Sequence, residues 1–302
     1  MKPDEPTSLL EVKGLRKWFP VGKRGWGRSP ASVVKGVDDV SFTLQAGETL
    51  GLVGESGSGK TTTARCVMRA IEPTAGEVRF RLPDGQWVDL TRLPERRLKP
   101  VRQHMQMVFQ DPYSSLNPRM TVGDIVAEPL LLHHLAGRKE REDQVVAMLE
   151  RVGLRADHRL RYPHAFSGGQ RQRISIARAL IMRPSLIVCD EATSALDVSV
   201  QAQVLDLLKE LQRDFNLTYL FVAHNLDVVR NFCDRVAVMR RGRIVELAET
   251  SRLFAAPQHP YTRLLLSAIP SPDPDVPMNF EVADELARLD TAADASSAAG
   301  DA

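Results

Sequence analysis

The chain has 302 residues, enough for one large domain or two ordinary ones with a sizeable core. Lysine and arginine total 40 against 38 acidic residues, and the formal net charge of +2 disfavours dedicated nucleic-acid binding. The longest uncharged stretch, residues 215–226, is shorter than the roughly 20 mostly apolar residues of a membrane helix. We therefore expect that the chain does not cross a bilayer.

The N-terminus and the cysteines indicate a cytoplasmic protein. Residues 1–6 are acidic and interrupted by proline, and no apolar segment of a secretory signal follows them. Cys66, Cys189 and Cys233 are too far apart for a disulfide framework or a metal-ligand set. We expect all three thiols to be reduced and mostly buried.

Apolar patterning predicts an α/β fold. Residues 40–45 alternate apolar and polar as a half-buried antiparallel strand does, and residues 49–53 lead into a glycine-rich loop. Residues 185–189 and 218–222 are continuous apolar runs, typical of parallel strands covered on both faces. Between them a helical stripe predicts a helix on the sheet, formed by Val204, Leu207, Leu208, Leu211 and Phe215.

Two further regions differ from this α/β pattern. Residues 111–183 have apolar spacing of the helical kind, and we expect them to form a helical insertion. Beyond Glu249 the prolines predict little regular structure; they are Pro257, Pro260, Pro270, Pro272, Pro274 and Pro277. Residues 291–302 are small or polar, and we expect a disordered tail.

A phosphate-binding loop follows the strand at residues 49–53. It matches G-x-x-x-x-G-K-[ST] between a strand and a helical stretch, which makes a flexible turn with a chance lysine a poor alternative. Its N–H groups can surround a β-phosphate, Lys60 can reach the β and γ oxygens, and the Thr61 hydroxyl can hold Mg²⁺. The expected nucleotide contacts are Gly54, Glu55, Ser56, Gly57, Ser58, Gly59, Lys60, Thr61 and Thr62.

Two acidic residues, Asp190 and Glu191, end the apolar strand at residues 185–189. Consecutive strand residues point to opposite faces, so the two carboxylates can have different roles. Asp190 can orient the Mg²⁺ shell, and Glu191 can accept a hydrogen bond from a water aimed at the γ-phosphate. Two acids after a strand are more often a solvated loop, but the phosphate loop in the same chain favours function.

The run Ser167, Gly168, Gly169 and Gln170 is a second candidate phosphate-binding element. Its glycines can bring backbone N–H groups close to an anion, and a helix N-terminus follows them. Taken alone, this run reads better as a helix cap.

In this order the motifs resemble the ATP-binding cassette (ABC) ATPases, from about Leu9 to Asp273. The resemblance rests on the phosphate loop, Gln110, the Ser-Gly-Gly-Gln signature, the acidic strand end, residues 194–197 and His224. It implies an α/β P-loop NTPase fold with a RecA-like parallel-sheet core, an N-terminal antiparallel β subdomain and a nested α-helical subdomain. It also implies ATP and Mg²⁺ as cofactors, and a head-to-tail dimer with ATP between the phosphate loop of one subunit and the signature of the other.

The resemblance assigns a role to each matching residue. Glu191 becomes the general base, His224 the γ-phosphate contact, Asp197 a cross-dimer contact and Phe19 the aromatic that stacks on adenine, with Trp18 as its neighbour. The expected metal-site residues are Thr61, Gln110 and Asp190. Singly, Gln110, His224 and Asp197 could equally be an edge-strand residue, a strand-end histidine and a helix N-cap. Asn225 replaces the family's usual aspartate beside the histidine, which removes a negative charge there.

Longer strings are similar to the ATPase subunits of bacterial oligopeptide and dipeptide importers, in particular the F-type subunit. They are residues 109–122, 161–170 and 257–270. The resemblance implies two membrane-spanning permease subunits, a second ABC ATPase of the D type, an extracytoplasmic solute-binding protein, and a peripheral position on the cytoplasmic face of the inner membrane. It divides the chain into an ABC ATPase domain at 7–252, with the helical subdomain at 111–183, and a C-terminal extension at 253–302.

Three interpretations stay open at this point. The same subfamily resemblance covers uptake of nickel, glutathione, opines and some sugars, so the ligand can differ. A soluble ABC ATPase of DNA repair or translation is a weaker alternative, because the chain has neither an inserted coiled coil nor a second cassette. The surface around residues 110–132 is a candidate docking groove for a membrane subunit, and the glycine-rich loop at residues 21–29 has no assigned function.

Overall fold

The computed structural model describes residues 7–21 and 32–268. The expected disordered tail and nearly all of the glycine-rich loop at residues 21–29 lie outside these ranges. Within them, no helix combines the length and the apolar character that a membrane span needs.

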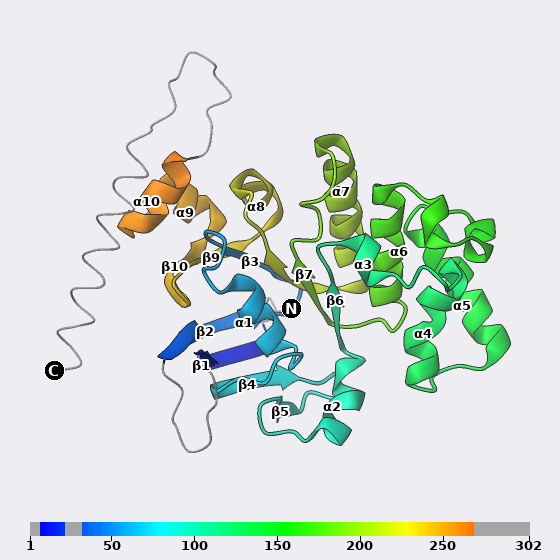
Figure 1. Ribbon diagram of the computed structural model, residues 1–302, viewed down its shortest axis with the longest axis horizontal. Coiled ribbons are helices and arrows are strands. Elements are labelled where there is room, and N and C mark those ends of the chain that lie inside the picture. Colours follow the sequence, from blue (N-terminus) through cyan, green and yellow to red (C-terminus); the bar gives the residue numbers. More distant parts are fainter. Residues whose placement is uncertain (1–6, 22–31, 269–302) are drawn as a thin grey trace, which may run out of the picture.

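A six-stranded sheet forms the centre of the molecule (Figure 1). The strand order is β10-β9-β3-β8-β7-β6; all neighbours are parallel except the edge pair β9 and β10. The strands are β3 (Thr49–Val53), β6 (Met105–Val108), β7 (Leu186–Asp190), β8 (Thr218–Val222), β9 (Arg235–Arg240) and β10 (Arg243–Glu249). The predicted strands at 49–53, 185–189 and 218–222 are thus three neighbours in this sheet.

Alternate residues of the central strands belong to two different hydrophobic cores. Leu186 and Val188 face one core, whereas Ile187 and Cys189 face the other. This is the two-residue period of a strand covered on both sides, which explains why β7 and β8 read as unbroken apolar runs. Burial raises the pKa of Cys66 to about 11 and that of Cys189 to about 12, so both thiols remain protonated at neutral pH.

A second sheet, four-stranded and antiparallel, lies on one side of the central sheet. Its strand order is β2-β1-β4-β5. It consists of β1 (Ser8–Val21), β2 (Ser32–Gln45), β4 (Ala75–Arg81) and β5 (Trp87–Asp89). The predicted strand at 40–45 is the end of β2, where Val40, Phe42 and Leu44 are buried. Helix α1 (Lys60–Val67) lies between this sheet and the central one, and α2 (Glu95–Arg102) leads into β6 (Figure 1).

The stretch between β6 and β7 is helical, as its spacing predicts. It contains α3 (Pro112–Ser115), α4 (Val122–Leu132), α5 (Arg138–Arg151), α6 (Gly168–Leu180) and two short 3₁₀ helices, Ala156–Leu160 and Pro163–Ala165. Figure 1 shows these helices gathered at one end of the molecule. Val145, Leu149 and Val152 pack with α4 and α6 in one core, so the apolar residues of α5 and of its C-terminal end form a buried face.

The C-terminal part is more regular than its prolines suggest. Two helices, α9 (Thr250–Ala255) and α10 (Pro260–Ser267), follow β10 directly. The expectation of little regular structure beyond Glu249 is therefore wrong for these residues. Pro260 is the first residue of α10, a position where proline costs no helical hydrogen bond and its fixed φ suits the helix.

Helix α7 (Val198–Phe215) carries the apolar stripe predicted between β7 and β8. Val204, Leu207, Leu208 and Leu211 are buried against the sheet, and α8 (Leu226–Phe232) lies beside it on the same core. Asn216 ends α7 in the left-handed conformation, with φ 51°, and starts the chain back into β8.

The stripe on α7 gives the first testable prediction. Leu211→Ala removes a fully buried side chain and should lower the free energy of unfolding by about 2–5 kcal/mol, because a cavity is left under the helix. Val198→Ala on the same helix is the control: its side chain is 84% exposed, and its effect should stay within about 0.5 kcal/mol. Urea unfolding of the two variants beside the wild type measures both values; equal effects would contradict the assigned core.

Candidate active site

The phosphate loop lies between β3 and α1 and leaves no room for side chains at two of its glycines. A Cβ at Gly54 would lie 2.1 Å from the Met239 carbonyl oxygen, and one at Gly59 would lie 2.4 Å from that of Gly36. Both residues also have positive φ, 145° and 105°, which glycine adopts without strain. Gly57 is different, because no heavy atom lies within 4 Å of the position of its Cβ. The loop is therefore packed against the protein at both ends and open in the middle.

Lys60, the first residue of α1, is buried and points back into the loop. Its Nζ donates to the carbonyl oxygens of Gly54 and Glu55, both at 2.7 Å. Burial lowers the pKa of this ammonium group, and the nearby carboxylates of Glu191 and Asp190 oppose that shift. The positive charge is thus held at the centre of the loop, where a phosphate would lie.

The next residue, Thr61, joins the phosphate loop to the acidic strand end. Its hydroxyl donates to Asp190 Oδ1 at 2.8 Å, and Arg65 lies one helical turn later with Nη2 3.6 Å from Asp190 Oδ2. Burial raises the pKa of Asp190, whereas the bond from Thr61 and the charge of Arg65 lower it. Thr62 follows on α1 and is partly buried. Arg65 was not among the predicted site residues, although its spacing of four from Thr61 places both on one helix face.

Glu191 lies at the meeting point of three strand ends. Gln110, two residues after β6, donates its Nε2 to Glu191 Oε2 at 2.8 Å. His224, two residues after β8, has Nδ1 3.3 Å from the same oxygen. Glu191 itself has φ 50° and is held there by its N–H on the Val222 carbonyl, 3.0 Å away. A positive φ at a non-glycine residue is unfavourable, so the surrounding structure holds Glu191 in this conformation.

Phe19 and Asp197 lie at more exposed positions. A Cβ at Gly36 would lie 2.8 Å from Phe19 Cε2, so the Phe19 ring covers Gly36, whose carbonyl in turn abuts Gly59 of the phosphate loop. Phe19 is 37% exposed and is thus an apolar ring next to the loop. Asp197 is at the N-cap position of α7, yet its side chain makes no capping hydrogen bond. The carboxylate is exposed instead.

The signature residues form the N-terminus of α6. Ser167 is the N-cap, and a capping box is present: Gln170 N donates to Ser167 Oγ at 3.3 Å, and Ser167 N donates to Gln170 Oε1 at 3.1 Å. Gly168 and Gly169 follow as the first helical residues. Helix α6 packs on α3, α4, α5, α7 and β6, whereas α1 packs on β1, β2, β7 and β8. The two candidate phosphate-binding elements therefore lie in different parts of the fold (Figure 1).

The residues present fit a nucleoside triphosphate with Mg²⁺. The loop is open at Gly57, a helix N-terminus follows it, and Lys60 supplies positive charge. Thr61 and Asp190 offer a hydroxyl and a carboxylate 2.8 Å apart, the hard oxygen ligands that Mg²⁺ prefers. The chemistry of both donor sets matches the expected cofactors.

Comparison with known proteins gives the family. The family model described as ABC transporter matches residues 37–194, and a second model, the oligopeptide/dipeptide transporter C-terminal region, matches residues 245–291. The chain belongs to the ABC transporter family. Among its relatives, the oligopeptide transport ATP-binding protein OppF of Bacillus subtilis is 54% identical over 272 residues, which cover 90% of this chain and 85% of that protein.

Two other similar proteins support the same family and fold. AppF, also an oligopeptide transport ATP-binding protein of Bacillus subtilis, is 51% identical over 264 residues, covering 87% of this chain and 78% of its own. Among solved structures, the dimeric ATP-binding cassette MJ0796 in a post-hydrolysis state bound to ADP and Pi gives a TM-score of 0.69. The two chains are 26% identical, and the match covers 80% of this chain and 99% of MJ0796. The predicted P-loop ABC ATPase fold is thus confirmed.

The structure also explains why this ABC ATPase tolerates Asn225 next to His224. Asn225 is the N-cap of α8, and its Oδ1 accepts from the N–H of Asp227 at 2.9 Å and of Val228 at 3.4 Å. Asparagine and aspartate cap helices about equally well, so the substitution preserves the backbone that carries His224. The missing charge therefore leaves the local geometry in place.

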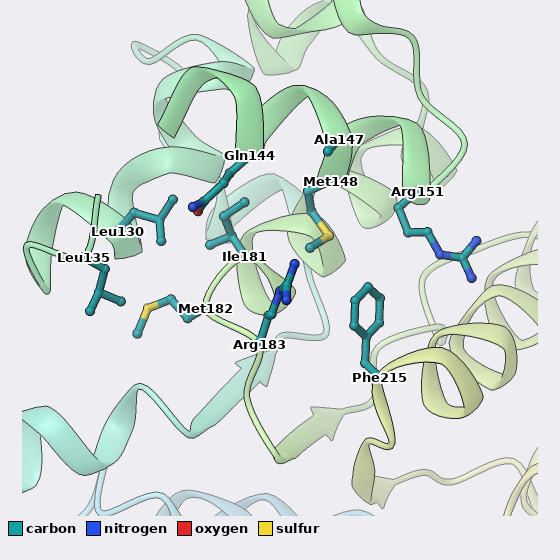
Figure 2. A pocket seen from close by; sticks show the side chains of 10 residues that line it. All are labelled: Leu130, Leu135, Gln144, Ala147, Met148, Arg151, Ile181, Met182, Arg183 and Phe215. Atoms are coloured by element: carbon teal, nitrogen blue, oxygen red, sulfur yellow. The ribbon is translucent and has the colours of Figure 1, made fainter. Parts of the chain in front are cut away.

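A separate hollow lies outside this site, between α4, α5 and the end of α7. Figure 2 shows Met148, Met182 and Phe215 around it, with Arg151 and Arg183 beside them. Its lining includes none of the residues predicted to bind nucleotide. The hollow is therefore not part of the candidate active site.

The position of Glu191 gives the second prediction. Glu191→Gln keeps a hydrogen-bond acceptor for Gln110 but removes a proton acceptor, so ATP turnover should fall by about 10²–10⁴-fold while ATP still binds. Glu210→Gln, on the exposed face of α7, should leave turnover unchanged. Phosphate release and nucleotide binding are measured on both variants. Wild-type turnover in Glu191→Gln would exclude the assignment of a general base.

Proposed function

We propose that this chain is the ATP-hydrolysing subunit of an ABC importer for peptides. The observation that carries the ATPase part is the Thr61–Asp190 hydrogen bond, which joins the phosphate loop to the acidic strand end beside Glu191. The peptide part is supported by the named function of OppF and AppF and by the match of residues 245–291 to the oligopeptide/dipeptide transporter C-terminal region. These names favour peptides over nickel, glutathione, opines or sugars.

In this proposal the phosphate loop, residues 54–62, binds the phosphates of ATP, and Lys60 turns from the loop carbonyls toward the β and γ oxygens. Thr61, Asp190 and Gln110 hold Mg²⁺, which would screen the phosphate charges when bound. Phe19 stacks on the adenine, supported by its exposed ring beside Gly36 and the loop. Arg65 opposes the rise in the pKa of Asp190 that burial causes.

Glu191 is the general base of the proposed hydrolysis. Gln110 and His224 both contact Oε2, which fixes the carboxylate and leaves Oε1 as the atom that takes the proton from a water. His224 is the contact to the γ-phosphate. Gln110 follows β6 and His224 follows β8, so each side chain links Glu191 to a different neighbouring strand.

The proposal includes a head-to-tail dimer with a second ABC ATPase, the D-type paralogue. Ser167, Gly168, Gly169 and Gln170 open α6 at a distance in the fold from α1, and Ser167 and Asp197 are exposed. A nucleotide on the phosphate loop would meet these groups from the other subunit. The dimeric state of the MJ0796 structure supports this arrangement.

Two membrane-spanning permease subunits are the proposed partners at the groove between α2, β6, α4 and α6. Phe109, Glu95, Arg102, Glu128 and Arg178 line this groove, which combines apolar and charged side chains. Phe109 faces it while the next residue, Gln110, contacts Glu191. A partner there would move with the active site. An extracytoplasmic solute-binding protein completes the proposed complex, with this subunit peripheral on the cytoplasmic face of the inner membrane.

We also propose a division of the chain. The ABC ATPase domain spans residues 7–252, with the helical subdomain at 111–183 nested between β6 and β7. The extension at 253–302 begins within α9 and contains α10.

Reconstitution tests the whole proposal. Purified complex with its permease subunits in proteoliposomes should take up a labelled peptide only with binding protein and ATP, and Lys60→Ala should abolish both uptake and tight ATP binding. Lys209→Ala is the control; it loses a contact to the Asn231 carbonyl and one to the face of the Phe232 ring, both away from the phosphate loop. Uptake of Ni²⁺ instead of peptide would show that the transported ligand is not a peptide. Wild-type ATP affinity in Lys60→Ala would exclude the phosphate-loop assignment.

The sandwiched site gives a separate prediction. Ser167→Arg places a bulky cation at the N-terminus of α6, where it blocks the approach of the other subunit. The isolated subunit should bind ATP normally, whereas the assembled complex should lose most of its ATPase activity. Ser251→Arg, exposed on α9, is the matched control. Full activity of the Ser167→Arg complex would argue against a nucleotide shared between subunits.

A further inference from the structure

The phosphate loop has a contact that comes from the far end of the chain. Tyr261, in α10, is fully buried, and its hydroxyl oxygen accepts a hydrogen bond from the backbone N–H of Glu55 at 3.2 Å. Burial raises the pKa of Tyr261, and the Glu55 carboxylate adds to this rise, so the phenol stays neutral at physiological pH. None of the roles derived above uses this hydroxyl.

The Glu55 peptide group is held on both sides. The Tyr261 hydroxyl accepts a hydrogen bond from the Glu55 N–H, and the Glu55 carbonyl oxygen accepts one from Lys60 Nζ at 2.7 Å. One residue thus separates the tyrosine hydroxyl from the ammonium group that we assign to the phosphates. A change in the orientation of the Glu55 peptide would therefore alter a hydrogen bond of Lys60 directly.

The tyrosine ring is itself fixed by neighbouring elements. His259 caps α10, with its Nδ1 accepting from Tyr261 N at 3.1 Å. The Glu246 carboxylate of β10 accepts from the N–H of Gln258 and of His259, both at 2.9 Å. The Arg240 guanidinium lies 5.0 Å from the centre of the Tyr261 ring. The start of α10 is therefore anchored to β9 and β10, and the hydroxyl is aimed at the loop by a rigid support.

We propose that Tyr261 is a positioning residue for nucleotide binding: it holds the Glu55 peptide in the form that accepts a triphosphate, and it couples α10 to nucleotide occupancy. The inference rests on the proposed role of the phosphate loop and gives the C-terminal region a part in the nucleotide site. Coupling of this kind is reciprocal, so ATP must also stabilise the docking of α10.

Removal of the hydroxyl tests the proposal. Tyr261→Phe keeps the ring and leaves the Glu55 N–H without its acceptor, so ATP affinity should fall by about 3–10-fold, with KM raised and kcat unchanged. Tyr219→Phe is the matched control: Tyr219 is also fully buried, but its hydroxyl donates to the Leu208 carbonyl at 2.9 Å, under α7. Both variants should lose similar thermal stability, and only Tyr261→Phe should lose affinity.

Hydrogen exchange on the wild-type full-length chain gives an independent test. ATP added with EDTA, to prevent hydrolysis, should slow amide exchange in α10 as well as at the phosphate loop, and Tyr261→Phe should lose the effect in α10. Unchanged exchange in wild-type α10 would overturn the proposal, and so would equal affinity losses in Tyr261→Phe and Tyr219→Phe. Lys60→Ala distinguishes failure of the proposed function from failure of the Tyr261 role. Wild-type ATP affinity in Lys60→Ala refutes the phosphate-loop assignment. Lost affinity in Lys60→Ala together with unchanged ATP binding in Tyr261→Phe refutes only the role of Tyr261.

Discussion

The buried ammonium group of Lys60 is the charge around which the candidate active site is arranged. A cation removed from water is unfavourable unless other groups replace its hydration. Here the carbonyl oxygens of Gly54 and Glu55 do so directly, and the carboxylates of Asp190 and Glu191 favour its charged form. The carbonyls come from the loop itself, but these two carboxylates come from the last residue of β7 and the residue after it, more than 100 residues away in the chain. Full compensation of the Lys60 charge thus requires the assembled central sheet.

Parallel strands bring these groups together. The phosphate loop follows β3, Gln110 follows β6, Glu191 follows β7 and His224 follows β8, and these strands end at the same edge because all four are parallel. Ligands of open α/β sheets bind at this edge. The sheet order places Glu191 between the Gln110 and His224 side chains, which explains why one carboxylate oxygen receives both contacts. The register of four strands therefore decides the geometry of the chemistry.

Much of this could be predicted from local patterns, and the failures have physical reasons. Strands β7 and β8 and helix α7 were recognisable because their burial gives a clear period, and the phosphate loop because steric demands restrict its residues. The number of prolines was misleading at α10, because a proline at the first helical position removes no helical hydrogen bond. Tyr261 gave no local signal of this contact: its partner Glu55 is 206 residues away, and the contacts of residues 258–261 with Glu246 and Arg240 help to bring them together.

The signature shows why a structural and a functional interpretation of one motif need not compete. As a helix cap, Ser167 and Gln170 exchange two hydrogen bonds and stabilise the start of α6. The N–H groups of Gly168 and Gly169 in the first turn have no acceptor within α6, because such groups lack carbonyl partners in the preceding turn. The cap thus fixes a helix N-terminus and leaves its glycine donors available to an anion. The proposed dimer needs this arrangement, since the phosphate that satisfies these donors would be bound to the other subunit.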